Sequence, residues 1–256
     1  FALKGRPADH PLIVHLPGFA HLPAWGRLES KATEELAATL AHRFWPGPLT
    51  IVLPRQPGVL DEVTGGLDTV ALRVPDHPVA LALLHAVGDG IAAPSANRFG
   101  RVSPTSAAHV LAEFGEGLAV LDGGPCRVGI ESTILDLSGP RPALLRPGGV
   151  PLEDIVALIG VVEVGGSVRV PGTLPAHYAP RTALLLTDDP LAAVTRLRAE
   201  GHTVALLPAG PVGAYARRLY AELRLLDEAG VDILVAERAP PAGLGRAIND
   251  RLDRAA

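Results

Sequence analysis

The last third of the chain alternates regularly between short apolar runs and helical segments. Apolar runs of this length are typical of buried strands, and the longer stretches between them are typical of helices. Strands are expected at residues 183–186, 203–207 and 232–236, and helices at residues 190–199, 213–229 and 243–253. Because a helix between two strands returns the chain to the same end of a sheet, such strands pair in parallel. The sequence therefore predicts a small Rossmann-like parallel α/β domain over residues 182–256.

A longer α/β region precedes this tail, and a Gly- and Pro-rich segment separates the two. Strands are expected at residues 11–16, 49–53, 70–74, 91–93, 119–121, 133–137, 143–145 and 161–164, and helices at residues 30–44, 78–87, 103–114 and 151–159. Ser30 and Ser103 are expected to cap their helices. We predict a twisted open-sheet α/β domain over residues 1–164 and an interdomain linker over residues 165–181. The chain opens in what reads as the middle of an element, so we expect that part of the N-terminal domain is missing from this sequence.

Composition limits the classes of protein that this chain can be. Of the 256 residues, 48% are hydrophobic and 20% are charged, and the formal net charge is -4. This balance is typical of a globular protein and argues against nucleic-acid binding over the whole surface, so a cationic site has to be local. A single cysteine excludes an internal disulfide and a cysteine-rich metal site. No apolar run is long enough to span a bilayer and no signal peptide is visible, so a cytoplasmic location is expected.

The strand expected at residues 91–93 runs into a polar loop that leads to the next helix. Such strand-to-helix junctions are where α/β proteins usually bind ligands, since helix N–H groups, small hydroxyls and Arg side chains together hold anions. Ser95 and Asn97 offer donors and acceptors in this loop, and Ser103 can serve a ligand as well as a helix end. The alternative is that Ser95 and Asn97 only form a turn and that Ser103 is only a cap.

Cations occur at three further points of the sequence. Lys4 and Arg6 alternate along an expected extended chain, which places both on one side for a triphosphate, or else on a solvated strand edge. Arg73 lies inside an apolar strand pattern and Arg146 precedes a Pro-Gly-Gly turn, so each needs an anionic ligand or a buried ion-pair partner. His15, after an apolar run, is by itself more typical of a structural histidine.

The order and spacing of these segments resemble the YrdC-like family of threonylcarbamoyl-AMP synthases. The resemblance rests on residues 4–7, 11–15, 44–50, 71–75, 94–104, 129–133 and 145–148, and the linker residues 171–173 and 177–180 resemble its two-domain branch. It implies a twisted open α/β sheet with a cationic concavity, and a nucleotidyltransferase that converts L-threonine, bicarbonate and ATP into threonylcarbamoyl-AMP and pyrophosphate. A separate transferase complex would then modify tRNA, so that direct tRNA binding is not required of this chain.

The resemblance also implies roles for individual residues. Lys4 and Arg6 would act in catalysis. The ATP-facing set would be Arg6, His10, Thr69, Ser95, Asn97, Ser103, Arg146, His177 and Tyr178, and the threonine-facing set would be His15, Arg73, Ala93 and Ser132. Mg²⁺ would be bound mainly through the ATP phosphates, with no metal site made by the protein. His10 stands where the family usually has Asn, and the family's upstream Pro-Thr-Glu-Thr segment is absent from this sequence.

Two other functions stay open at this point. The same cationic concavity could make the chain a double-stranded RNA-binding module, although its net negative charge weakens that reading. A carbamoyl-transfer relative that acts on another acceptor is the second alternative. Turnover that depends on threonine and bicarbonate separates both from the synthase.

Overall fold

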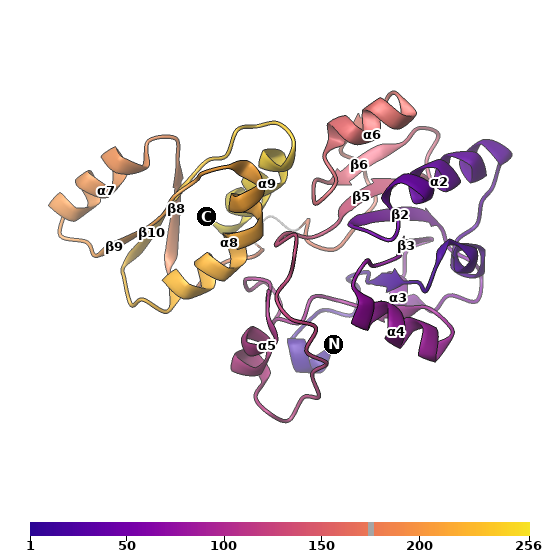
Figure 1. The fold of residues 1–256 in the computed structure, drawn as a ribbon, viewed down its shortest axis with the longest axis horizontal. Helices are drawn as coiled ribbons and strands as arrows, with labels where there is room; N and C mark the ends of the chain where they lie inside the picture. Colours follow the sequence, from indigo (N-terminus) through magenta and orange to yellow (C-terminus); the bar gives the residue numbers. More distant parts are fainter. Residues whose placement is uncertain (174–176) are drawn as a thin grey trace. The chain divides into compact units, whose positions relative to one another are not determined.

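The computed structural model describes residues 1–173 and 177–256 and divides the chain into two compact units (Figure 1). The first unit consists of Phe1–Pro94 and Glu131–Thr173, and the second of Ser95–Ile130 and the remainder of the chain to Ala256. The chain therefore leaves the first unit at Pro94 and returns to it at Glu131. The domain boundaries predicted at residues 164 and 182 remain a prediction, but the segment Ser95–Ile130 packs with the C-terminal part of the chain.

A mixed sheet of seven strands forms the centre of the first unit, counted over the described residues. In spatial order the strands are β4 (Ile91–Ala93), β1 (Ile13–His15), β3 (Thr69–Arg73), β2 (Leu49–Pro54), β5 (Thr133–Asp136), β6 (Ala143–Arg146) and β7 (Glu163–Val164). The pairs β1–β3, β2–β5 and β6–β7 are parallel and the other neighbours are antiparallel. Central strand β2 is buried at five of its six positions, which explains its nearly continuous apolar sequence.

Helices and short turns complete the first unit. They are η1 (Ala2–Lys4), η2 (Phe19–His21), α1 (Leu22–Trp25), α2 (Lys31–Phe44), α3 (Asp61–Thr64), α4 (Pro78–Val87) and α6 (Leu152–Ile159). As predicted, Ser30 caps α2, because its hydroxyl accepts the backbone N–H of Thr33 at 3.1 Å. One face of α2 buries Ala37 and Leu40 in the same core as β2 and β3.

The second unit contains a three-stranded parallel sheet in the order β8–β10–β9, as far as the described residues go. Its elements are α5 (Ala107–Phe114), β8 (Ala183–Thr187), α7 (Pro190–Ala199), β9 (Val204–Leu207), α8 (Val212–Asp227), β10 (Ile233–Glu237) and α9 (Leu244–Ala255). The predicted alternation of strands and helices in the tail is confirmed, as is the parallel pairing. Val102, Ile130 and Tyr178 share one buried apolar cluster with residues of α8 and α9.

One predicted strand is absent, and one predicted helix starts later than expected. Residues 119–121 form no strand; they lie between glycines and Leu121 is 69% exposed, so no neighbouring strand buries this run. The helix predicted from Ser103 begins only at Ala107, and Ser106 is its cap, accepting the N–H of His109 at 3.4 Å. Pro104 disfavours the helical conformation at the residue before it, which explains the later start. The last predicted strand of the first unit is shortened to β7.

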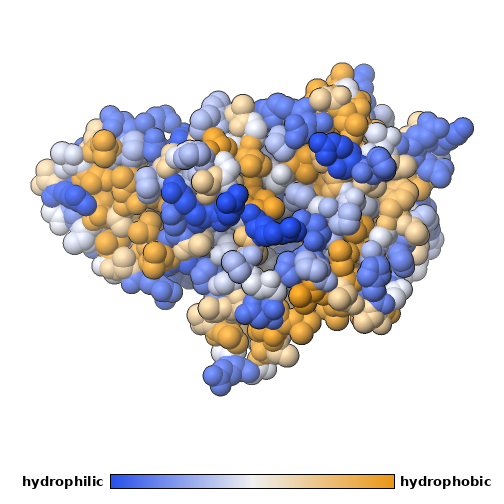
Figure 2. Space-filling model, viewed as in Figure 1, coloured by the Kyte–Doolittle hydropathy of each residue, from blue (hydrophilic) through white to orange (hydrophobic). Residues whose placement is uncertain are grey.

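Hydrophobic surface is distributed in patches among hydrophilic residues on the visible face of each unit (Figure 2). Among the described residues, no helix combines the length and the apolar character that crossing a membrane requires.

Candidate functional site

Polar side chains from several strands meet at one edge of the sheet in the first unit. His15 and Arg73 are the last residues of the parallel strands β1 and β3 and pair directly in register. Antiparallel β2 begins at this edge, which places Thr50 there, and Thr133 at the start of β5 is level with Leu49. These strands therefore bring a histidine, a cation and hydroxyl groups to one edge, as expected for the ligand-binding edge of an α/β sheet.

Arg146 at the end of β6 adds a buried cation to this edge. Its guanidinium donates to the carbonyl oxygen of Ser132 from Nε at 3.2 Å and from Nη2 at 2.8 Å, to the Ser132 hydroxyl at 3.2 Å, and to the carbonyl of Pro171 at 2.8 Å. Arg146 and Ser132 are each 2% exposed. Within the described part of the chain no carboxylate pairs with Arg146, so its buried charge is held by neutral oxygens alone, and an anion nearby would stabilise it.

Thr50 links this cation to the sheet. Its hydroxyl and that of Ser132 lie 2.8 Å apart, and Thr50 is fully buried. The sequence analysis assigned Thr50 no role, although a single threonine in an otherwise apolar strand was the available signal. It fixes the Ser132 hydroxyl, which in turn contacts Arg146.

Gly148 allows the chain after β6 to approach Ser132 closely. A Cβ atom at this position would lie 2.4 Å from the carbonyl carbon of Ser132 and from the backbone nitrogen of Thr133. The neighbouring Gly149 N–H donates to the Glu131 carbonyl at 2.9 Å. The absence of a side chain at Gly148 thus permits the packing that aligns Ser132 with Arg146.

His15 is held neutral at this edge. Burial and the charge of Arg73 lower the pKa of His15 from 6.5 to about 4, although hydrogen bonds with the backbone of Ile91 and Ile13 oppose the change. Arg73 donates from Nε to the Gly47 carbonyl at 2.9 Å. Ala93, in β4, is paired with Ile13 two residues before His15. At neutral pH this part of the edge therefore combines a neutral imidazole with a guanidinium.

The N-terminal residues of the predicted site are arranged differently from the prediction. Lys4 ends the short helix η1 and Gly5 is left-handed at φ 65°, so Lys4 and Arg6 do not alternate along an extended chain. Arg6 is 9% exposed and donates to the carbonyl of Pro11 at 2.7 Å. Burial and the charge of Arg6 lower the pKa of His10, and the Asp9 carboxylate opposes this.

The predicted site residues are divided between the two units. Thr69 begins β3, at the opposite end of that strand from Arg73. The first unit holds Lys4, Arg6, His10, His15, Thr69, Arg73, Ala93, Ser132 and Arg146, and the second unit holds Ser95, Asn97, Ser103, His177 and Tyr178. The roles predicted for them remain predictions.

In the second unit, Asn97 shapes the polar loop that precedes α5. Its Nδ2 donates to the carbonyls of Arg98 and Arg101 at 2.8 and 2.9 Å, and the residue is 1% exposed. Ser103 is also buried, whereas Ser95 is exposed. The turn alternative considered for Asn97 is thus part of its role, since its amide group holds its own loop.

His177 and Tyr178 are buried in the second unit. The His177 N–H donates to the carbonyl of Arg254 at 3.0 Å, and the Tyr178 ring stacks on Tyr220 with centroids 5.6 Å apart. Tyr178 has φ 63°, a backbone conformation that residues other than glycine rarely adopt.

Fold and site together define a two-domain α/β protein whose larger sheet carries arginines, a histidine and hydroxyl groups at one edge. The family model described as "Telomere recombination" matches residues 1–148, and the model for the threonylcarbamoyl-AMP synthase C-terminal domain matches residues 150–256. Threonylcarbamoyl-AMP synthases of Pyrococcus abyssi and Bacillus subtilis are 42% and 41% identical to the whole chain, which covers 82% of each. That of Schizosaccharomyces pombe is 34% identical, again over the whole chain, and 78% of it is covered.

Solved structures give the same result. The crystal structure of P. abyssi Sua5 complexed with L-threonine is similar over the whole chain and 82% of its own length, with a TM-score of 0.91 and 41% identity. The protein belongs to the threonylcarbamoyl-AMP synthase family, in its two-domain branch. The predicted fold class and family are confirmed.

Proposed function

We propose that this protein makes L-threonylcarbamoyl-AMP and pyrophosphate from L-threonine, bicarbonate and ATP. The observation that carries the proposal is the sheet edge of His15, Arg73, Ser132 and Arg146, whose buried cation Arg146 has no carboxylate partner within the described part of the chain. It occurs in a chain whose full-length relatives are named for this reaction, one of them solved with L-threonine.

The chemistry requires charge neutralisation more than proton transfer. The threonine amine and bicarbonate form a carbamate and release water; a carbamate oxygen then attacks the α-phosphorus of ATP, and pyrophosphate leaves in line with the new P–O bond. Nucleophile and electrophile are both negative, so cations that align them lower the barrier. We assign the threonine carboxylate to Arg73, a fork-shaped donor suited to it, with His15, Ala93 and Ser132 around the amino acid.

The remaining assignments concern the nucleotide. Lys4 and Arg6 are proposed to neutralise charge on the phosphates as the catalytic cations, with the rest of the predicted ATP set around the nucleotide. Mg²⁺ is proposed to enter with ATP. The described residues offer no group of three metal-ligating side chains, so phosphate oxygens and water are proposed as the ligands of the ion. When bound, Mg²⁺ would neutralise phosphate charge. The product is proposed to pass to a threonylcarbamoyl transferase that modifies tRNA.

Pyrophosphate release tests the proposed reaction. Release from ATP should require both threonine and bicarbonate, and mass spectrometry should detect threonylcarbamoyl-AMP. Binding of double-stranded RNA without such turnover, or turnover with another carbamoyl acceptor in place of threonine, would refute the proposal.

Threonine binding tests the role of Arg73. In Arg73→Ala, calorimetry should show threonine affinity reduced at least about 100-fold, because a bidentate charge-assisted pair is lost. ATP affinity should change little. Arg73→Lys should recover only part of the affinity, since an ammonium group cannot form the fork. Threonine binding that survives Arg73→Ala would contradict the assignment.

A further inference from the structure

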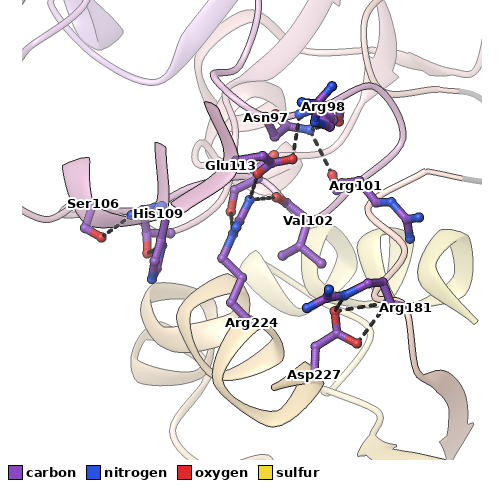
Figure 3. Close-up of polar contacts among 12 residues, drawn as sticks. Asn97, Arg98, Arg101, Val102, Ser106, His109, Glu113, Arg181, Arg224 and Asp227 are labelled. Atoms are coloured by element: carbon purple, nitrogen blue, oxygen red, sulfur yellow. Dashed lines mark hydrogen bonds and ion pairs between the residues drawn. The ribbon is translucent and has the colours of Figure 1, made fainter. Parts of the chain in front are cut away.

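A chain of polar contacts joins helix α8 to the loop of residues 95–103, and it depends on Arg224. The guanidinium donates to the backbone carbonyls of Val102 and of Ser103, the latter from Nε at 3.3 Å (Figure 3). Its Nη2 also pairs with Oε2 of Glu113 at 2.7 Å. The second half of the loop is therefore attached to α8 through one side chain.

Glu113, on α5, holds the first half of the same loop. Its other oxygen, Oε1, accepts the backbone N–H of Arg98 at 2.7 Å (Figure 3). The side chains of Arg224 and Glu113 are only 17% and 11% exposed, so water screens this ion pair weakly. The contacts run from the Arg98 amide through both side chains to the Val102 and Ser103 carbonyls. They fix two points of the loop relative to each other.

The loop needs such support because it contains no regular structure. Within the loop, Asn97 donates to two carbonyls and the Ala179 N–H donates to the Gly100 carbonyl at 3.0 Å. A cavity of about 340 Å³ beside it is lined by residues that include Arg98, Arg101, Arg181 and Arg224. Val102 packs in the apolar cluster of α8 and α9, whereas Arg98 and Arg101 are exposed beside the cavity, so polar contacts contribute to the conformation of this part of the loop.

We propose that Arg224 and Glu113 are positioning residues, through which the C-terminal α/β domain holds the loop of Ser95, Asn97 and Ser103 in the conformation that binds ATP. The proposal rests on the proposed function, which assigns this loop to the nucleotide. Neither residue contacts substrate. Arg224 acts by fixing where the Ser103 and Val102 backbone lies, and Glu113 acts by fixing the Arg98 amide.

The central variant is Arg224→Ala. We expect its KM and Kd for ATP to rise about 10-fold, which is within the usual range for coupling between two sites. The kcat at saturating ATP should stay within about two-fold of wild type. Threonine affinity should be unchanged, since the residues assigned to threonine belong to the first unit. Arg224→Lys keeps the charge but reaches fewer acceptors, so its ATP affinity should be intermediate.

Helix α8 offers a matched control. Arg218 donates to the carbonyls of Pro208 and Ala209 at 2.6 and 2.7 Å, and none of its contacts reaches the loop. Arg218→Ala therefore removes an equivalent arginine from the same helix and should leave ATP affinity at the wild-type value. Glu113→Gln should weaken ATP binding, and Arg224→Ala added to it should cause less than the product of the two single effects, because both act through one contact chain.

Hydrogen exchange and the wild-type assay distinguish failure of the positioning proposal from failure of the proposed function. Faster exchange of amides 98–103 in Arg224→Ala than in Arg218→Ala, together with the selective loss of ATP affinity, would support the proposal. Wild-type ATP affinity in Arg224→Ala, or equal losses of ATP and threonine affinity, would overturn it. Absence of threonylcarbamoyl-AMP from the wild-type assay would refute the proposed function instead, and absence of ATP binding by wild type would overturn both.

Discussion

At the scale of single residues, the site depends on the buried cation Arg146, with which no carboxylate pairs in the described part of the chain. The sequence alone predicted that Arg146 needs an anion or a buried ion pair, and the structure favours the anion, because neutral oxygens from Ser132 and Pro171 surround the guanidinium. That distinction could not come from the sequence, since Pro171 is 25 positions away. Likewise, nothing in the local pattern around Arg224 indicates that it reaches Val102 and Ser103.

Replacing Arg146 should remove the response of the protein to ATP. ATP should raise the unfolding temperature of wild type, since a ligand that binds only the folded state stabilises it. In Arg146→Met that increase should be lost. Arg141→Met is the control, because Arg141 is 71% exposed and its 3.5 Å pair with Glu163 lies at the surface. An ATP-dependent increase that persists in Arg146→Met would show that this arginine is only structural.

His15 should make stability depend on pH. Because its pKa is about 4 in the folded protein and 6.5 in the unfolded chain, the unfolded chain binds more protons between these values. The free energy of unfolding should therefore fall as pH decreases from 6.5 to 4, by up to about 3 kcal/mol, and this contribution should be fully present above pH 6.5. Denaturant titrations at several pH values should show that the free energy of unfolding changes more steeply with pH between 4 and 6.5 in wild type than in His15→Gln. The same pH dependence of the free energy of unfolding in both proteins would contradict the buried neutral state of His15.

At the scale of elements, strands were easier to predict than the chain that follows them. Apolar periodicity located β2, β3 and the strands of the tail, because burial on both faces leaves an apolar run. It failed at residues 119–121, where an apolar run lies on the surface, and at Ser103, where Pro104 delays the helix. Thr50 was overlooked although it interrupts an apolar run, because its contact with Ser132, 82 positions away, cannot be seen in the sequence.

Gly148→Ala should disturb the element boundary at which Ser132 lies. The added Cβ meets backbone atoms of Ser132 and Thr133 at 2.4 Å, and backbone cannot move aside as a flexible side chain can. We expect a loss of about 2–4 kcal/mol in the free energy of unfolding, together with weaker threonine binding. Gly139→Ala is the control, because a Cβ there meets only the Arg141 carbonyl at 3.9 Å. A Gly148→Ala protein as stable as the control would contradict this packing.

At the scale of the whole molecule, the sequence predicted two α/β domains but assigned residues 95–130 to the first. Contacts place this segment with the C-terminal part of the chain, where Val102 and Ile130 share the apolar cluster of α8 and α9. The predicted domain boundaries stay a prediction, and the long-range burial that groups this segment with α8 and α9 leaves no local pattern in the sequence.

Val102→Ala tests this partition. Removing two methyl groups at a position 4% exposed should lower the stability of the second unit by about 1–2 kcal/mol. Native-state hydrogen exchange should show faster opening of α8 amides, with β2 amides unaffected. Faster exchange in β2 rather than in α8 would indicate that residues 95–130 belong energetically with the first unit.

The excursion of the chain from Pro94 to Glu131 restricts how the C-terminal domain can be exchanged between relatives. A chimera joined only after Thr173 would combine Val102, Gly129 and Ile130 of one parent with the helices of another. The Gly129 position illustrates the difficulty, because a Cβ there would lie 2.3 Å from the Arg217 carbonyl oxygen. A working chimera should therefore take residues 95–130 and the C-terminal part of the chain from the same parent. Among relatives, substitutions in α8 should covary with substitutions in residues 95–130, about a hundred positions earlier.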